Sequence, residues 1–294
     1  MSNLVLVNKP KGITSFRVVA ILKRKLNIKR IGHTGTLDPM ATGVLPLLTG
    51  RASRLSSLML DSEKAYKAVV RLGTTTDTLD ITGAVLSTSK VNVTDEELQK
   101  AVNSFLGHYM QTPPMYSALK KDGVRLYDLA RQGIEVERKA REVEIKKISL
   151  VKRINQTDFI IEVLCSKGTY IRSLALDIGE KLGVGATLLE LERTLAAGFS
   201  IDECTPLDVI EQDETLSFLK SAEDAVRHLN EVFVSDKQAI RFANGGQLGL
   251  ERLKCDINLT DGEKIRVKHG NELIGIGTVN LKENRVDIAC IIKE

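Results

Sequence analysis

Strand-like and helix-like segments alternate irregularly along this chain, without the strand–helix–strand rhythm of a doubly wound sheet. Apolar patterns typical of strands occur at residues 4–8, 65–73, 141–151 and 158–165, whereas residues 171–182 have helical spacing. Such an irregular order is typical of α+β proteins. The sequence therefore predicts an α+β fold with a mixed, largely antiparallel sheet flanked by helices.

The length of the chain indicates more than one folded unit. A chain of 294 residues is too long for one small core and favours a large domain followed by a smaller one. Residues 202–232 are rich in acidic side chains and are expected to be helical and connective. A short helix at 237–243 and alternating strands up to Ile292 should follow. We therefore predict a large domain at residues 1–232 and a small β-rich domain at residues 233–294.

The composition excludes several classes of protein. Apolar residues make up 43% of the chain and charged residues 27%, which is the balance of an ordinary globular protein. The N-terminus lacks the cationic start and long apolar run of a signal peptide. No apolar stretch approaches the roughly 20 residues that span a bilayer. We expect a cytoplasmic protein that does not enter a membrane.

The four cysteines lie far apart in the sequence, at Cys165, Cys204, Cys255 and Cys290. Zinc sites use closely spaced pairs, so no metal site is expected unless distant cysteines converge in the fold. We interpret the four side chains as reduced packing residues.

The charges are unevenly distributed, although the net charge is only +4. Residues 1–60 contain ten basic side chains and one acidic side chain, whereas residues 202–236 contain ten acidic and two basic ones. A basic half that faces away from an acidic segment suits a polyanionic partner, but an unevenly charged solvated surface explains the counts equally well. The lone acid of the first sixty residues is Asp38, and the surrounding cations should favour its ionised form.

The first predicted helix places cations beside an apolar face. Thr14 supplies a cap, and Lys23, Arg24 and Lys25 lie just off the buried side. A capping box predicts a further helix from residue 94 through residue 105. The apolar face of the first helix consists of Val18, Val19, Leu22 and Leu26.

Asp38 lies in a Gly/Thr-rich stretch, residues 32–43, which we expect to be a loop with little apolar content. Loops of this kind often carry functional side chains because a rigid scaffold can aim them at a ligand. The alternative is an ordinary Asp-Pro turn with His33 bonded nearby, and composition alone favours the turn.

Five separate motifs, in order along almost the whole chain, reverse that preference. The chain resembles the TruB family, the bacterial tRNA pseudouridine-55 synthases. A single motif would be weak, but five in sequence are not a coincidence. The motifs are Lys9-Pro10-Lys11-Gly12-Ile13-Thr14-Ser15, Gly32-His33-Thr34-Gly35-Thr36-Leu37-Asp38-Pro39, Lys64-Ala65-Tyr66 with Arg71-Leu72-Gly73, Gln111-Thr112-Pro113-Pro114-Met115-Tyr116-Ser117-Ala118, and Cys165-Ser166-Lys167-Gly168-Thr169-Tyr170-Ile171-Arg172.

The resemblance implies the pseudouridine synthase fold, with a catalytic domain at residues 1–232. The closing segment is similar to a PUA domain, a small RNA-binding barrel. The implied activity is an isomerase that needs neither a metal nor another cofactor. By resemblance Asp38 is the nucleophile, Arg172 its basic partner, and Tyr66 the residue that stacks on the target base. A carboxylate in a desolvated pocket needs such a cation to stay ionised.

Further residues take roles from the same resemblance. His33 helps to displace the target uridine, Tyr170 and Leu191 line the uracil pocket, and Asp80 helps to bind the base or arrange the pocket. Without the family, Tyr66, Tyr170 and Leu191 would be interpreted as core residues. RNA contacts are expected from Lys9, Lys23 and Arg24. The chain departs from the family pattern at one position. Glu192 precedes Arg193 where the family usually has two basic residues, so phosphate contacts at this position are in doubt.

The implied partner is tRNA, bound through its T-arm stem-loop, with no protein partner required and a monomer expected. The target uridine lies in structured RNA and must be flipped out before it reacts. Two alternatives stay open: a synthase directed to another RNA, and a non-catalytic RNA-binding or tRNA-folding protein in which Asp38 has no chemical role.

Overall fold

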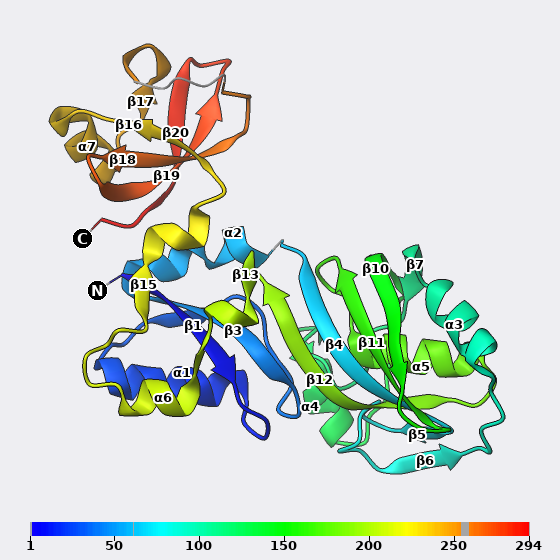
Figure 1. Cartoon of the computed structure of the whole chain (residues 1–294). Coiled ribbons are helices and arrows are strands. Elements are labelled where there is room, and N and C mark those ends of the chain that lie inside the picture. The colour runs from blue at the N-terminus through cyan, green and yellow to red at the C-terminus, as the bar shows by residue number, and fades with distance from the viewer. Residues whose placement is uncertain (1, 61, 254–258, 294) are drawn as a thin grey trace.

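The computed structural model describes residues 2–60, 62–253 and 259–293, and its larger part is built on one long mixed sheet (Figure 1). All neighbours along the sheet are antiparallel except the pairs β14–β1 and β3–β12, which confirms the predicted largely antiparallel arrangement. In spatial order the strands are β14 (Thr205–Pro206), β1 (Asn3–Lys9), β3 (Thr42–Thr49), β12 (Ala186–Ala196), β4 (Lys64–Leu72), β11 (Asp158–Cys165), β10 (Arg141–Arg153) and β7 (Gly107–Gln111). The short strands β2 (Ile31–His33), β13 (Phe199–Ser200) and β15 (Leu219–Ser221) pair with β3, β12 and β1.

Strand β4 shows how side chains on one face of the sheet enter the main core. Tyr66, Ala68 and Val70 are buried, whereas Lys67 between them is exposed. Successive side chains of a strand point to opposite faces, so this alternation directs the apolar set into the core. The strand lies between β11 and β12 and pairs antiparallel with both.

The helices begin where the cap signals predict. The Thr14 side chain accepts from the Arg17 amide at the start of α1 (Ser15–Leu26). The predicted capping box of Thr94 is confirmed at α3 (Asp95–Asn103), which ends two residues before the expected position. Helix α5 (Ile171–Lys181) has a buried first turn. Shorter elements are α2 (Ser56–Leu60), α4 (Leu126–Arg131), the β5–β6 hairpin (Thr74–Thr76, Val85–Thr88) and the β8–β9 hairpin (Lys120–Lys121, Val124–Arg125).

The acidic segment 202–232 differs from its prediction. It is only partly helical, because besides α6 (Leu207–Gln212) it contributes β14 and β15 to the large sheet. It also does not face away from the basic helix α1. The Lys25 ammonium donates to the Glu211 carbonyl over 2.9 Å, and Arg24 lies 3.8 Å from the Glu211 carboxylate. Opposite charges attract these two segments, so the sequence-level separation of charge is partly cancelled in space.

The C-terminal part forms a separate five-stranded sheet (Figure 1), in agreement with the β-rich character predicted for this segment. Its first strand starts at Asn230, three residues before the predicted boundary, because β16 pairs in parallel with β18. Ile276 and Ile292 pack in one apolar cluster with Leu4 of β1. The strands are β16 (Asn230–Phe233), β18 (Lys264–His269), β19 (Glu272–Asn280), β20 (Arg285–Ile291) and β17 (Leu248–Gly249), beside α7 (Asp236–Ala243).

Two further predictions concern cysteines and membranes. Cys165 is buried, Cys204 and Cys290 are half-buried, and all three are free thiols. Cys255 lies outside the described residues. Among residues 2–60, 62–253 and 259–293, no helix combines the length and the apolar character needed to cross a membrane.

Candidate active site

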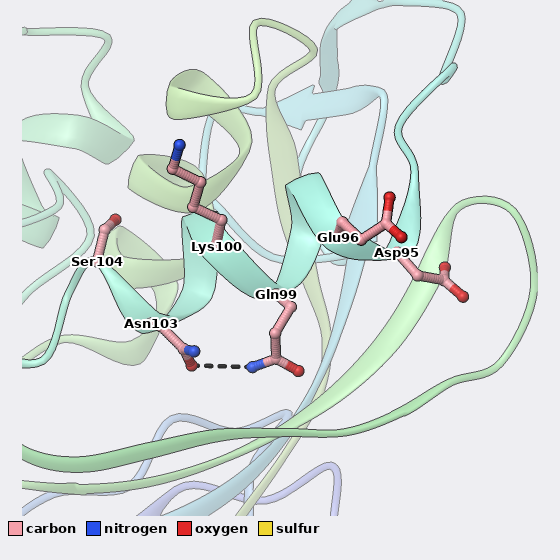
Figure 2. A pocket seen from close by; sticks show the side chains of 6 residues that line it. All are labelled: Asp95, Glu96, Gln99, Lys100, Asn103 and Ser104. Atoms are coloured by element: carbon pink, nitrogen blue, oxygen red, sulfur yellow. Dashed lines mark hydrogen bonds between the residues drawn. The ribbon is translucent and has the colours of Figure 1, made fainter.

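One hollow on the surface lies away from the predicted site. A hollow of about 740 Å³ lies along the outer face of α3. Figure 2 shows its lining side chains pointing to solvent, with the Gln99 amide donating to Asn103 over 2.9 Å. The lining residues are Asp95, Glu96, Gln99, Lys100, Asn103 and Ser104, none of which belongs to the predicted set.

The predicted site instead forms around the Asp38 loop, which connects β2 to β3. Ser15, at the start of α1, holds this loop through two hydrogen bonds to Leu37. The Ser15 hydroxyl donates to the Leu37 carbonyl over 3.1 Å and accepts from the Leu37 amide over 2.9 Å. The few apolar side chains of this loop, Leu37, Met40 and Ala41, are buried. Buried apolar side chains on either side of Asp38 leave that carboxylate projecting, with 34% of its side chain exposed.

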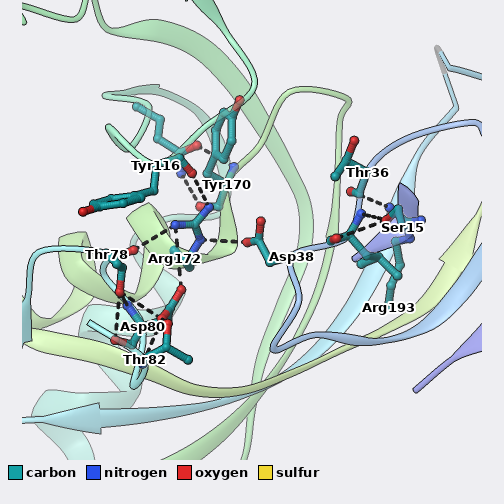
Figure 3. Close-up of polar contacts among 12 residues, drawn as sticks. Ser15, Thr36, Asp38, Thr78, Asp80, Thr82, Tyr116, Tyr170, Arg172 and Arg193 are labelled. Atoms are coloured by element: carbon teal, nitrogen blue, oxygen red, sulfur yellow. Dashed lines mark hydrogen bonds and ion pairs between the residues drawn. The ribbon is translucent and has the colours of Figure 1, made fainter. Parts of the chain in front are cut away.

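Arg172 reaches the Asp38 carboxylate from the first turn of α5, as the resemblance predicted. Its Nε lies 2.8 Å from Asp38 Oδ2, and its side chain is only 5% exposed. The two terminal nitrogens donate to the carbonyls of Thr78 and Tyr116, each over 2.8 Å. Figure 3 shows this guanidinium between the two loops and the carboxylate. A planar guanidinium held on three sides cannot turn away, so it presents one fixed donor to Asp38.

Asp80 supports the same arginine. Its Oδ2 lies 3.8 Å from Arg172 Nη1, and its other oxygen accepts from the Thr78 hydroxyl and from the Thr82 amide. Its side chain is 7% exposed. These contacts place Asp80 against Arg172, so arranging the pocket is the predicted role that we retain for it, as a prediction.

Tyr66 and Leu191 lie on adjacent strands, β4 and β12, within the main apolar core. Their exposed fractions are 8% and 7%. Burial raises the pKa of Tyr66 to about 12, and the Arg193 guanidinium opposes that rise. The phenol is therefore neutral at pH 7 and can donate a proton in a hydrogen bond.

Tyr170 precedes Arg172 by two residues and is positioned by Gln111 of β7. The Gln111 amide accepts from the Tyr170 backbone N–H over 2.8 Å and donates to the Tyr170 carbonyl over 3.1 Å. Burial raises the pKa of the Tyr170 hydroxyl, whereas the Arg172 charge lowers it. The structure thus places Tyr170 beside Arg172, at the same end of α5.

His33 lies at the end of β2, shortly before Asp38. Burial lowers the pKa of His33, and the Arg193 charge lowers it further, so the ring is neutral at pH 7. Its Nδ1 is buried and has no hydrogen-bond partner among the residues that the structure describes. A neutral ring with an unused nitrogen is available to meet a base.

The structure contradicts the prediction that Lys9 contacts RNA. The side chain of Lys9 is fully buried. Its ammonium donates to the carbonyls of Pro10 over 2.9 Å, Ile13 over 2.8 Å and Pro39 over 3.4 Å. Burial lowers the pKa of Lys9 to about 8, and the Asp38 charge acts against this shift. Lys9 therefore ties the residue after Asp38 to the first turn of the chain, and no surface remains through which it could reach a phosphate.

Lys23 and Arg24 belong to α1 and do not join the residues around Asp38. Arg24 is 77% exposed, in spite of its weak pairing with Glu211. The Lys23 ammonium forms no ion pair or hydrogen bond with any described residue. These two cations are thus available to a partner outside the Asp38 pocket itself.

Comparisons with known proteins identify the family. The family described as "TruB family pseudouridylate synthase (N terminal domain)" matches residues 23–171. A tRNA pseudouridine synthase B of Clostridium tetani is 43% identical over 278 residues, which cover 94% of this chain and 95% of the relative. This chain belongs to the TruB family. A second TruB relative, the tRNA pseudouridine synthase B of Alkaliphilus oremlandii, is 39% identical and covers 97% of this chain and 95% of its own.

Solved structures support the fold of this TruB-family chain. A chain of an H/ACA RNP bound to a substrate RNA containing 2′-deoxyuridine aligns with a TM-score of 0.74 at 23% identity, over 99% of this chain and 85% of that one. A chain of a Cbf5-Nop10-Gar1 complex aligns with a TM-score of 0.73 at 26% identity, over 99% of this chain and 84% of that one. The chain therefore has the pseudouridine synthase fold.

Arg193 is the site residue that sequence reasoning missed in this TruB-family chain. It is 1% exposed and lies in β12, two residues after Leu191. Alternation along a strand places both side chains on the same face, which is the signal that could have found it. Glu192 lies on the opposite face, across from Lys67 of β4. The loss of one basic residue at Glu192 thus leaves the buried arginine in place.

Proposed function

We propose that this chain converts uridine-55 in the T-loop of tRNA to pseudouridine, with Asp38 as the nucleophile. One observation carries the proposal: a partly exposed carboxylate is held at 2.8 Å by a buried arginine whose two terminal nitrogens each donate to a backbone carbonyl. Relatives about 40% identical over nearly the whole chain are named tRNA pseudouridine synthase B. The chain is accordingly an isomerase that acts on tRNA, and its place is the cytoplasm.

The reaction breaks the bond between N1 of uracil and C1′ of ribose and forms a bond between C5 and C1′. The hydrogen on C5 leaves to solvent and N1 gains a proton, so the net change is an isomerisation. The Asp38 carboxylate adds to the uridine and leaves again at the end. Arg172 pairs with that carboxylate and orients it in a pocket from which the base excludes water.

The neighbouring side chains have complementary tasks in this scheme. Tyr66 stacks on the target base, and its neutral phenol can exchange a proton with the substrate. Leu191 and Tyr170 enclose the uracil ring. The neutral His33 ring occupies the stack that the flipped uridine leaves. Base stacking on an aromatic ring contributes about 1–3 kcal/mol, which offsets part of the cost of flipping.

Outside the pocket, the cations of α1 and the C-terminal sheet would bind RNA. Lys23 and Arg24 would contact phosphates of the T-arm by shape and charge. We place the PUA-like domain in the C-terminal five-stranded sheet, whose first strand β16 starts at Asn230. One copy of the chain would suffice, because every residue assigned to the pocket comes from this chain.

One experiment distinguishes this function from non-catalytic RNA binding. Tritium release from tRNA labelled at C5 of uridine should be rapid with the wild type and absent with Asp38→Asn, which keeps the side-chain volume. A tRNA with cytidine at position 55 should release nothing. Release by Asp38→Asn at the wild-type rate would contradict the assignment of the nucleophile. Tight tRNA binding without any release by the wild type would instead indicate a non-catalytic RNA-binding protein.

A further inference from the structure

The Asp38 loop rests on a second arginine that the reaction scheme above does not use. Arg193 is among the largest fully buried side chains of the described residues. Its Nε donates to the Val44 carbonyl over 2.8 Å, and its terminal nitrogens donate to the carbonyls of Gly35 and Thr36 over 3.2 and 3.4 Å. Figure 3 shows the side chain directed at Thr36, in the loop that carries Asp38.

The environment of this guanidinium is unusual because it contains no counter-ion. Among the ion pairs of the described residues none involves Arg193, and three backbone carbonyls take the place of most of its water shell. A buried arginine without an acid is costly to keep, typically by several kcal/mol before its hydrogen bonds are counted. Its presence at full burial needs a reason beyond packing.

The backbone around Arg193 is adapted to its position. Arg193 pairs with Gly43 of β3 on one side and with Tyr66 of β4 on the other. Gly43 has a φ of +104°, and a Cβ there would lie 2.2 Å from the Arg193 carbonyl oxygen. Only glycine permits so close an approach of β3 to β12. The arginine therefore lies directly between the nucleophile loop and the active-site tyrosine.

The charge of Arg193 acts on several groups of the pocket. It lowers the pKa of His33 and opposes the burial that raises the pKa of Tyr66, with whose hydroxyl the guanidinium also interacts. The charge of Arg193 thus lowers the pKa of both His33 and Tyr66 relative to the values that burial alone would give. Both effects follow from placing a fixed positive charge in a low-dielectric interior.

We propose that Arg193 is a positioning residue for pseudouridine formation, which couples the Asp38 loop to the Tyr66 hydroxyl through its fork of donors. This proposal rests on the proposed function. The guanidinium holds the loop at Gly35 and Thr36, and Arg193 is the cross-strand neighbour of Tyr66. Moving either group would move the other, so the nucleophile and the tyrosine keep one fixed separation as the uridine enters between them.

The test compares Arg193→Lys with Arg153→Lys as a matched control. Arg153 also donates to two loop carbonyls, those of Asn155 and Gln156, and lies on β10 away from the site. Lysine keeps the charge but cannot contact several acceptors in one plane. The measurements are the single-turnover tritium release rate with enzyme in excess, the Kd for tRNA, and the thermal midpoint.

We expect Arg193→Lys to slow release about 10- to 100-fold, as the loss of charged hydrogen bonds predicts, with the Kd changed less than about threefold. Arg153→Lys should lower the midpoint but leave the rate unchanged. The Tyr66→Phe and Arg193→Lys effects should be non-additive in the double variant, because each breaks the same contact.

Each other outcome overturns the proposal. A release rate for Arg193→Lys equal to that of Arg153→Lys would make the arginine structural only, and so would strict additivity with Tyr66→Phe. Failure of Arg193→Lys to fold, with Arg153→Lys folded, would make the arginine a requirement of the fold and not of the reaction. An inactive wild type would contradict the proposed function itself. Failure of the proposed function can therefore be distinguished from failure of the proposal for Arg193.

Discussion

Replacing Arg172 with alanine should damage both the fold and the reaction, and the structure sets the size of the first effect. The arginine is 5% exposed and Asp80 beside it is 7% exposed. Removing one member of a buried pair costs about 3–5 kcal/mol, because the other charge stays buried alone. Asp38 is 34% exposed and can recover water, which favours the lower end of that range. We expect a loss of about 3 kcal/mol.

For a chain of this size such a loss lowers the thermal midpoint by about 6–12 °C, at about 2–4 °C for each kcal/mol. The release rate should fall at least about 100-fold, since the carboxylate loses the charged donor that lies 2.8 Å away. Thermal denaturation followed by circular dichroism and single-turnover tritium release measure the two effects separately.

Two companion variants sharpen this test. Arg172→Lys should restore part of the stability but little of the rate, because lysine cannot donate to Thr78, Tyr116 and Asp38 together. Arg172→Ala combined with Asp80→Asn should be less destabilised than the sum of the single changes, because no buried charge is left alone. A midpoint for Arg172→Ala within about 2 °C of the wild type would refute the reasoning from burial.

Three further predictions concern other parts of the molecule. Thr94→Ala removes the capping box of α3 and should cost about 1 kcal/mol in unfolding free energy, with tritium release unchanged. The Arg71 hydrogen bond is the main cause that lowers the pKa of Asp158 to about 2, from 3.8. That contribution is full above pH 4 and is lost as the pH falls towards 2, so acid denaturation should lose this dependence in Asp158→Asn. Lys23→Gln should reduce the slope of log Kd for tRNA against log salt by about one, whereas Lys25→Gln should change it less because the Lys25 ammonium donates to the Glu211 carbonyl. Equal slopes for both variants would contradict the assignment of phosphate contacts to α1.

Much of the local structure was determined by the sequence itself. The cap at Thr14, the capping box at Thr94 and the alternation at residues 65–73 each depend on neighbouring residues, and all three appear where expected. Local hydrogen bonds and apolar periodicity act over a few residues, so they can be read without knowing the fold. The motif around Asp38 likewise identified the family before any distance was known.

The tertiary structure decided which charges are buried and which face a partner. Lys9 and Lys23 look alike in sequence, but Lys9 is enclosed by three carbonyls while no described residue pairs with Lys23. Arg193 carried no assigned role until strands from distant parts of the chain placed it between Gly43 and Tyr66. The reason is physical: the cost of burying a charge depends on acceptors that come from remote segments, and only the folded chain brings those acceptors together.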